Sequence, residues 1–162
     1  METTIKLKTK KITKESFKKF GQFIDNNTSE TPTIKTESVT FWKQQIKTIM
    51  GGAYEIGLLK VKRQEMIFSE LENHFQSPTG LLSLDGSFKL ALGIPSDNIP
   101  GKEDIEAFEV PAYQMLMIDA KCWHGVCYPQ DKDEITILVF MAKDALENDT
   151  VNKKLDNTFE IC

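Results

Sequence analysis

Short apolar runs alternate with turn residues between positions 53 and 141, and this pattern limits the available folds more than any other feature. The runs are rich in β-branched and aromatic residues, and Pro, Gly or an Asp-Gly pair separates them. Such spacing favours a β-sandwich or barrel over parallel strands that alternate with helices. The strands expected from it are 53–62, 66–74, 80–84, 87–92, 105–110, 114–118 and 135–141.

Two parts of this pattern carry more specific expectations. Asp85-Gly86 is a strong tight-turn dipeptide, so residues 80–84 and 87–92 are expected to form a hairpin. Residues 135–141 are an unbroken apolar run, which is typical of a strand buried on both faces.

Helix is expected only near the two ends of the chain. Residues 13–20 predict a short helix, with Thr13 as the N-cap and two phenylalanines as an apolar stripe. The polar stretch 144–157 is a second helix candidate, and residues 159–161 are a candidate edge strand.

Composition limits the classes of function. A chain of 162 residues is expected to form one domain over residues 1–162. The net charge of −4 argues against nucleic acid as a partner, and no apolar run has the length of a membrane span. The segment Met1-Glu-Thr-Thr lacks the basic-then-apolar layout of a signal peptide, so a cytoplasmic protein is expected.

The segment 66–74 carries an unusual polar face. Side chains two apart on a strand share a face, so Glu70, Glu72 and His74 are expected to point the same way. The same face begins with apolar residues, as in a strand that lines a barrel with a polar site at its mouth. A solvated outer face is the alternative interpretation.

His124 is the second of only two histidines and follows the predicted strand 114–118. An imidazole titrates near neutral pH and can bind a metal or move a proton. Two histidines and Glu72 would suit a divalent transition metal with open coordination positions. Each histidine alone is more often structural, but together with Glu72 they favour a site.

The three cysteines, Cys122, Cys127 and Cys162, are too few for a disulfide scaffold and fit a reducing compartment. Cys122 and Cys127 flank His124, so a cysteine-containing metal site is an alternative. The absence of a Cys-x-x-Cys pair favours ordinary thiols instead, and Cys122 is only a weak candidate nucleophile.

Four stretches carry a resemblance to a known family, and their order and spacing are more specific than any one of them. They are residues 12–24, Leu71-Glu-Asn-His74 followed by Leu84-Asp-Gly86, Ala107-Phe108, and Gln114 followed by Trp123-His124. In this order they resemble the motifs of the ureidoglycolate lyase (formerly hydrolase) family, a branch of the cupin superfamily. The likeness runs from residue 4 to about residue 141.

The resemblance implies a mainly β fold, a cupin-type double-stranded β-helix or jelly-roll barrel with a short N-terminal helix and ligands inside. It implies cleavage of ureidoglycolate to glyoxylate and urea, a step of purine and allantoin breakdown, or reaction of a related small polar carboxylate. Glu72, His74 and His124 would take the metal-binding positions, with nickel, zinc, iron or manganese as the ion and no organic cofactor. A homodimer is expected as well.

The resemblance also assigns roles in catalysis. His74 or Glu72 would remove the substrate's hydroxyl proton, and His124 would protonate the departing urea. The substrate-binding residues that it implies are Gln114, Trp123, Glu70, Thr79 and Lys121.

Several positions depart from the family pattern. Thr79 stands where the family usually has Gln, Ser83 where it has Pro, and Ala120-Lys121 where it has Arg-Gly. Lys121 offers a point charge in place of the bidentate fork of an arginine, so this departure bears on the substrate rather than on the fold. A non-catalytic small-molecule-binding cupin and a different metal-dependent cupin enzyme, such as an isomerase or oxygenase, remain alternatives.

Overall fold

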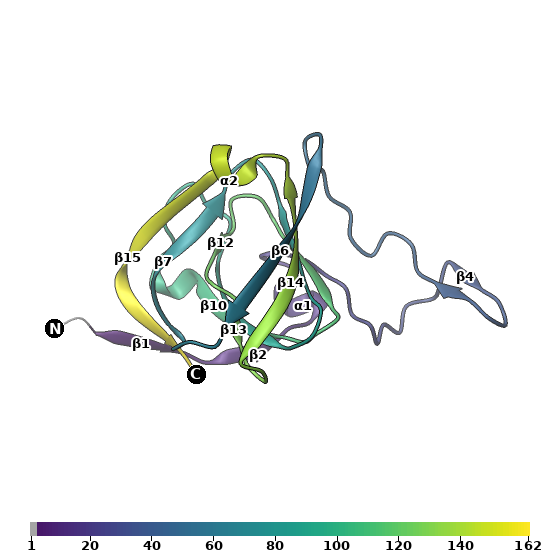
Figure 1. The fold of residues 1–162 in the computed structure, drawn as a ribbon, viewed down its shortest axis with the longest axis horizontal. Helices are drawn as coiled ribbons and strands as arrows, with labels where there is room; N and C mark the ends of the chain where they lie inside the picture. The colour runs from purple at the N-terminus through teal and green to yellow at the C-terminus, as the bar shows by residue number, and fades with distance from the viewer. Residues whose placement is uncertain (1–2) are drawn as a thin grey trace.

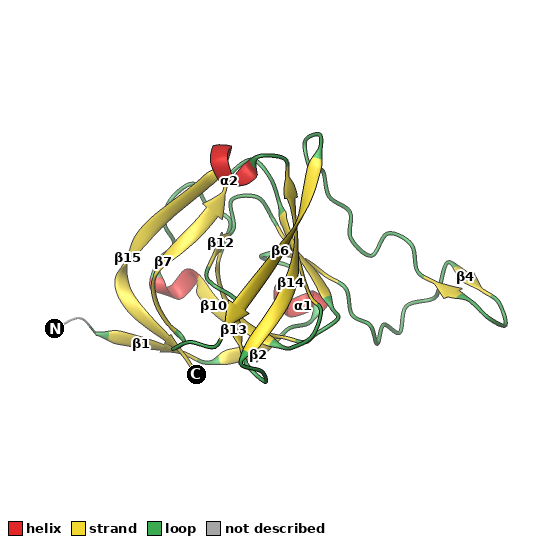
Figure 2. Cartoon of the chain, viewed as in Figure 1, coloured by secondary structure: helices red, strands yellow, loops and turns green. Residues whose placement is uncertain are grey.

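The chain folds into two facing β-sheets that curve into a nearly closed barrel (Figures 1 and 2). This computed structural model describes residues 3–162. Strands dominate, and the two α-helices are each four residues long. The predicted fold class, a mainly β, cupin-type jelly-roll barrel with a short N-terminal helix, is confirmed. Within residues 3–162, none of the helices has the length and apolar character needed to cross a bilayer.

The larger sheet contains most of the strands. Its members are β1 (Thr4–Leu7), β2 (Thr9–Lys11), β7 (Ile67–His74), β9 (Phe88–Gly93), β10 (Ile105–Val110), β12 (Trp123–His124), β13 (Tyr128–Pro129) and β15 (Thr150–Ile161). They follow the order β1-β15-β7-β12-β9-β10-β2, and β13 pairs with β9. The order places β7 between β15 and β12, in the middle of the sheet.

The smaller sheet faces the larger one. Its order is β3-β11-β8-β14-β6, formed by β3 (Gly21–Phe23), β11 (Met115–Ile118), β8 (Thr79–Ser83), β14 (Glu134–Ala142) and β6 (Tyr54–Lys62). Between β3 and β6 the chain leaves the barrel as a long arm, which Figure 1 shows extending to one side. The arm carries a two-stranded ribbon of β4 (Ile34–Lys35) and β5 (Thr40–Phe41).

The N-terminal helix, α1 (Lys14–Phe17), begins where the sequence predicts. The Thr13 hydroxyl accepts a hydrogen bond from Ser16 N at 3.0 Å, and the Ser16 hydroxyl accepts one from Thr13 N at 2.9 Å. Gly21 then starts β3 beside β11, where a Cβ atom would lie 1.9 Å from the carbonyl oxygen of Met117. No other residue would fit at this position of β3, and the helix, which ends at Phe17, is shorter than expected.

An aromatic cluster fills one part of the space between the sheets. The rings of Phe17 and Phe20 lie 5.9 and 5.5 Å from that of Phe108, both in edge-on arrangements that aromatic rings prefer. The same core includes Val61 and Leu81, which also line a cavity. The cavity is thus an unfilled continuation of the core.

The predicted hairpin over residues 80–92 is wrong. β8 pairs with β11 and β14 in the smaller sheet, whereas β9 pairs with β10, β12 and β13 in the larger one. The Asp85 carboxylate accepts a hydrogen bond from Thr136 N at 2.8 Å, and the Ser83 hydroxyl donates to the Gly86 carbonyl. The first contact ties the turn to β14 and the second closes the turn itself, which carries the chain from one sheet to the other.

The expectation of a helix over 144–157 is also wrong for most of that stretch. Only α2 (Ala145–Asn148) is helical, and β15 follows it as a twelve-residue strand. β15 lies between β7 and β1, so residues 159–161 are part of an interior strand rather than an edge strand. Pairing with a strand on each side makes this stretch a strand despite its polar composition. The polar side chains of Lys153 and Lys154 are compatible with this position because they remain in solvent.

The strand 135–141 is present as β14 but is not buried on both faces. Ile135 and Ile137 are fully buried between the sheets. Leu138 and Phe140 alternate with them on the outer face and are only half-buried. The smaller sheet therefore has an apolar outer face that the rest of the barrel leaves partly exposed.

Candidate metal centre

β7 brings the candidate site residues to one face of the larger sheet. Glu70, Glu72 and His74 all line the cavity, as expected for alternate residues of one strand. The register places His124 of β12 opposite Glu72 on one side, and Asn152 of β15 opposite Glu72 on the other. Three neighbouring strands therefore contribute to the same point of the barrel wall.

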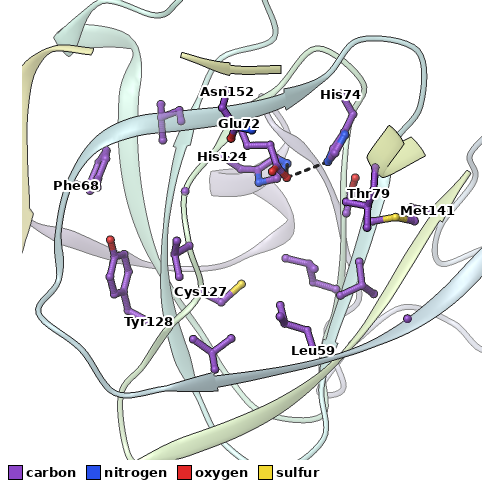
Figure 3. A pocket seen from close by; sticks show the side chains of 18 of the residues that line it. Leu59, Phe68, Glu72, His74, Thr79, His124, Cys127, Tyr128, Met141 and Asn152 are labelled. Atoms are coloured by element: carbon purple, nitrogen blue, oxygen red, sulfur yellow. Dashed lines mark ion pairs between the residues drawn. The ribbon is translucent and has the colours of Figure 1, made fainter. Parts of the chain in front are cut away.

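Glu72, His74 and His124 form a compact group (Figure 3). The distance from Glu72 Oε1 is 3.1 Å to His74 Nε2 and 3.8 Å to His124 Nε2. One ligand atom from each residue lies within 4.8 Å of the other two. Two imidazoles and one carboxylate at such distances could bind one divalent ion.

His74 is held in a defined orientation. Its Nδ1 atom lies 3.1 Å from the Asp149 carbonyl oxygen, which can only accept, so Nδ1 carries the hydrogen. The Thr150 hydroxyl lies 3.3 Å from the same nitrogen. Nε2 is then the atom directed at Glu72. A backbone carbonyl on the second ring nitrogen is the arrangement that orients metal-binding histidines in proteins.

His124 has a buried nitrogen without a partner. Its Nε2 atom makes no hydrogen bond among the described residues, although it is shielded from solvent. Burial lowers the pKa of His124 to about 4, so the imidazole is neutral at pH 7. A buried polar atom without a partner is costly, and a neutral imidazole offers a free lone pair.

The other two members of the group shift each other's protonation. The hydrogen bond with His74 lowers the pKa of Glu72 despite the opposing effect of burial. Burial lowers the pKa of His74, but the hydrogen bond and charge of Glu72 outweigh it and leave that pKa raised. Glu72 is therefore a carboxylate at neutral pH, and without an ion His74 is its proton-donating partner.

The remaining predicted site residues divide into two sets. Glu70 and Thr79 line the cavity. Trp123 is fully buried in the larger sheet's second apolar cluster, where its Nε1 donates to the Ser96 carbonyl. The Lys121 ammonium pairs with Asp97 at 2.9 Å. Gln114, Lys121 and Trp123 therefore lie outside the cavity lining.

The cysteine alternatives find no support in the geometry. Cys122 is buried and its thiol donates to the Gly93 carbonyl at 3.1 Å, away from the ion-binding group. Burial raises the pKa of Cys122 and raises that of Cys127 to about 12. Both thiols are thus protonated at neutral pH, which is the wrong state for a nucleophile. Neither belongs to the group of described residues that could hold an ion.

Sequence reasoning missed several residues of the site. Asn152 lines the cavity beside Glu72, and Asp149 orients His74, but both fall in the stretch expected to be helical. Tyr128 and Met141 also line the cavity. Alternation along β14 identifies Met141, whereas no local pattern marks the other three.

The cavity has a volume of about 790 Å³ and extends well beyond the three ligand residues. Glu72, His74 and His124 stand together in Figure 3, and Leu59, Cys127 and Tyr128 lie across the cavity from them. Most of the remaining lining is aliphatic or aromatic, supplied by β6, β8, β14 and the start of β7. The site is therefore a polar corner of a largely apolar chamber.

The fold and this corner define a cupin-type barrel protein with a candidate Glu-His-His metal centre. The chain belongs to the ureidoglycolate lyase family, whose family model matches residues 4–161. The resemblance drawn from the sequence motifs is thereby confirmed. A search of curated proteins finds no match.

Among solved structures, similarity is found to Bacillus subtilis oxalate decarboxylase, in a structure described by its Mn(II) centres. That match has a TM-score of 0.44 and 12% identity, and covers 60% of this chain and 23% of the other. A mutant of the same enzyme matches with a TM-score of 0.42 and 13% identity, over 63% of this chain and 24% of the other. This chain thus spans about a quarter of the length of either structure.

Proposed function

We propose that this chain is a metal-dependent carbon–nitrogen lyase that cleaves ureidoglycolate, or a related acid with a ureido group on its hydroxyl-bearing carbon, to a carbonyl compound and urea. The observation that supports it most is the buried, unpartnered Nε2 of His124, directed at Glu72 beside the oriented His74. Family membership supports the reaction class. The proposed place of this reaction is purine breakdown.

Glu72, His74 and His124 would hold the ion through Oε1 and the two Nε2 atoms. These donors fit nickel, zinc, iron or manganese, which accept mixed imidazole and carboxylate ligands. When bound, such an ion acts as a Lewis acid that polarises the substrate's oxygens. Only three protein ligands are present in this group, so positions remain open for a substrate.

Proton transfer then needs a group outside the three ligands. Glu70 is the proposed base, because it lines the cavity and lies on the same face of β7 as Glu72, about 7 Å away along the strand. It would take the hydroxyl proton as the C–O bond becomes a carbonyl. The electrons of the breaking C–N bond would leave with the urea nitrogen, which takes up the proton that Glu70 removed and so restores the base. Thr79 would orient the substrate through its hydroxyl.

His124 does not act as the acid in this mechanism, although the family resemblance implies that role. A pKa of about 4 leaves His124 without a proton to donate at pH 7. The same neutrality is what a metal ligand requires.

A metal-free reaction is the second candidate. The 3.1 Å contact between His74 and Glu72, with the pKa of His74 raised, is the arrangement of an acid–base pair. In that case Glu72 would remove the hydroxyl proton and His74 would protonate the leaving group. A nitrogen that coordinates an ion carries no proton, so the two candidates exclude each other.

The test is the release of urea from racemic ureidoglycolate by wild type, His124→Gln and Glu70→Gln, with and without added divalent metal. Asp97→Asn, outside the cavity, is the matched control. We expect metal-dependent release, reduced about a hundredfold or more by either cavity substitution. Release that persists in a chelator would favour the metal-free candidate. No release above the uncatalysed rate under any condition would leave a binding role.

A further inference from the structure

The cavity is far larger than a small carboxylate requires. Pockets of about 300 to 1,000 Å³ typically enclose drug-sized molecules, and the volume here is about 790 Å³. A ligand the size of ureidoglycolate would fill only the polar corner at Glu72, His74 and His124. The rest of the chamber would stay empty or hold water against apolar walls.

The walls beyond the corner are apolar and face inward. β6 and β14 pair so that Leu59 lies opposite Ile137, which is fully buried in the core. Side chains at alternate positions share this face, so Leu59, Val61 and Val139 point into the barrel. Further apolar residues of the lining include Phe68, Leu81, Tyr128 and Met141.

The charges on the lining do not favour a ligand that binds mainly through carboxylates. Glu55, Glu70 and Glu72 line the cavity, and Lys60 is the one lysine or arginine of the lining within residues 3–162. Lys60 pairs with Thr136 on the outer face of the sheet, alternating with the inward Leu59 and Val61. No arginine of the described chain lines the cavity to clamp a carboxylate.

We infer that the substrate carries an apolar portion, aliphatic or aromatic, that lies against β6, β8 and β14 while its polar head is at the Glu-His-His corner. The identity of the head rests on the proposed function, but the apolar portion rests on the cavity walls alone. The substrate class is therefore a substituted, amphipathic relative of a small hydroxy acid or ureide.

The inference is tested with n-alkylureas from methylurea to octylurea, which compete with the fluorophore N-phenyl-1-naphthylamine for the protein as purified. Each methylene that enters an apolar site raises affinity by about fourfold. We therefore expect affinity to climb with chain length until the cavity is full. Equal affinity across the series would overturn the inference.

Two adjacent residues of β14 give a matched control. Val139→Phe adds volume inside the cavity, whereas Leu138→Phe adds the same ring on the outer face of the sheet. Val139→Phe should lower the affinity for octylurea by tenfold or more and leave the affinity for methylurea unchanged. Leu138→Phe should alter neither affinity. If only Leu138→Phe weakens octylurea, the chains bind outside the barrel and the inference is rejected.

Leu59→Phe fills the same cavity from β6. It replaces Val139→Phe in the test if the circular dichroism spectrum shows that Val139→Phe does not fold like the wild type. The alkylurea series needs neither metal nor turnover. Chain-length dependence without urea release would retain the apolar site and reject the proposed reaction. Urea release without chain-length dependence would do the reverse.

Discussion

The Nε2 atom of His124 is shielded from solvent, yet it has no hydrogen-bond partner among residues 3–162. In metal-free protein this nitrogen contributes a desolvation cost and no compensating bond. We predict that His124→Leu leaves the free energy of unfolding in a chelator within about 1 kcal/mol of wild type, or raises it. Urea denaturation measures this. A loss of several kcal/mol would mean that the imidazole is held by structural contacts instead.

The single carboxylate of Asp149 holds the turn that follows β7. Its oxygens accept hydrogen bonds from Phe75 N, Gln76 N and the Ser77 hydroxyl at 2.9 to 3.1 Å. We predict that Asp149→Ala lowers the free energy of unfolding by about 3 kcal/mol, since bonds to charged groups are strong. Asp149→Asn, which keeps an acceptor oxygen, should lose about 1 kcal/mol. Equal losses for the two variants would contradict this account.

At the scale of elements, Glu106 on β10 connects β2 with the segment that follows α1. Its carboxylate accepts from the ammonium groups of Lys10 at 2.8 Å and Lys19 at 3.0 Å. Burial raises the pKa of Glu106, but the two hydrogen bonds outweigh it and hold that pKa below 4.5. The carboxylate therefore contributes stability above the unfolded-state pKa and loses it as pH falls through the lower, folded-state pKa.

The corresponding prediction compares wild type with Glu106→Gln. At pH 7 the variant should be about 1 kcal/mol less stable, because both partners are exposed and the pairs are partly screened. The difference should shrink as the pH is lowered below 4.5 and vanish when the wild-type carboxyl is protonated. Denaturation at several pH values gives the comparison. A difference that grows in acid would refute the assignment.

Some of these elements can be predicted from the sequence and others cannot. The polar face of β7 was predictable, because strand alternation alone places Glu70, Glu72 and His74 together. The Asp85-Gly86 turn was recognised, but a turn dipeptide carries no information on which sheet each flanking strand joins. β15 was missed because its pairing with β7 and β1, rather than its polar sequence, makes it a strand.

The site was predictable only in part for the same reason. Glu72 and His74 share a strand, whereas His124 reaches them through non-local pairing of β12 with β7. The motif match placed Trp123 and Lys121 near the site in sequence. Trp123 packs on the opposite side of the strand from His124, and Lys121 turns outward to Asp97. Asn152 has no sequence signal, because its role depends on the register of β15.

At the scale of the whole molecule, β6 leaves an edge of the smaller sheet free. Among the described strands it pairs with β14 alone, and Tyr54, Ile56 and Leu58 are more than half exposed on its outer side. We propose that a second copy of the chain covers this edge, because one strand can pair antiparallel with itself across a two-fold axis. Both copies would then satisfy their free backbone groups through the same contact.

The predicted result is a homodimer in sedimentation equilibrium. Leu58→Glu should yield monomers, because the charge would be buried in the contact. Lys60→Glu changes a residue on the same outer side nearer the end of the strand, and it should dissociate the dimer less. A wild type that sediments as a monomer at all concentrations would exclude this arrangement.

The proposed chemistry requires one ion bound by Glu72, His74 and His124. The most direct test is equilibrium dialysis of wild type and His124→Gln against nickel, zinc, iron(II) and manganese in turn, followed by elemental analysis. We predict about one equivalent of at least one metal per wild-type chain and a loss of at least tenfold in affinity for the variant. Equal binding of every metal by the two proteins, or none by either, would contradict the account.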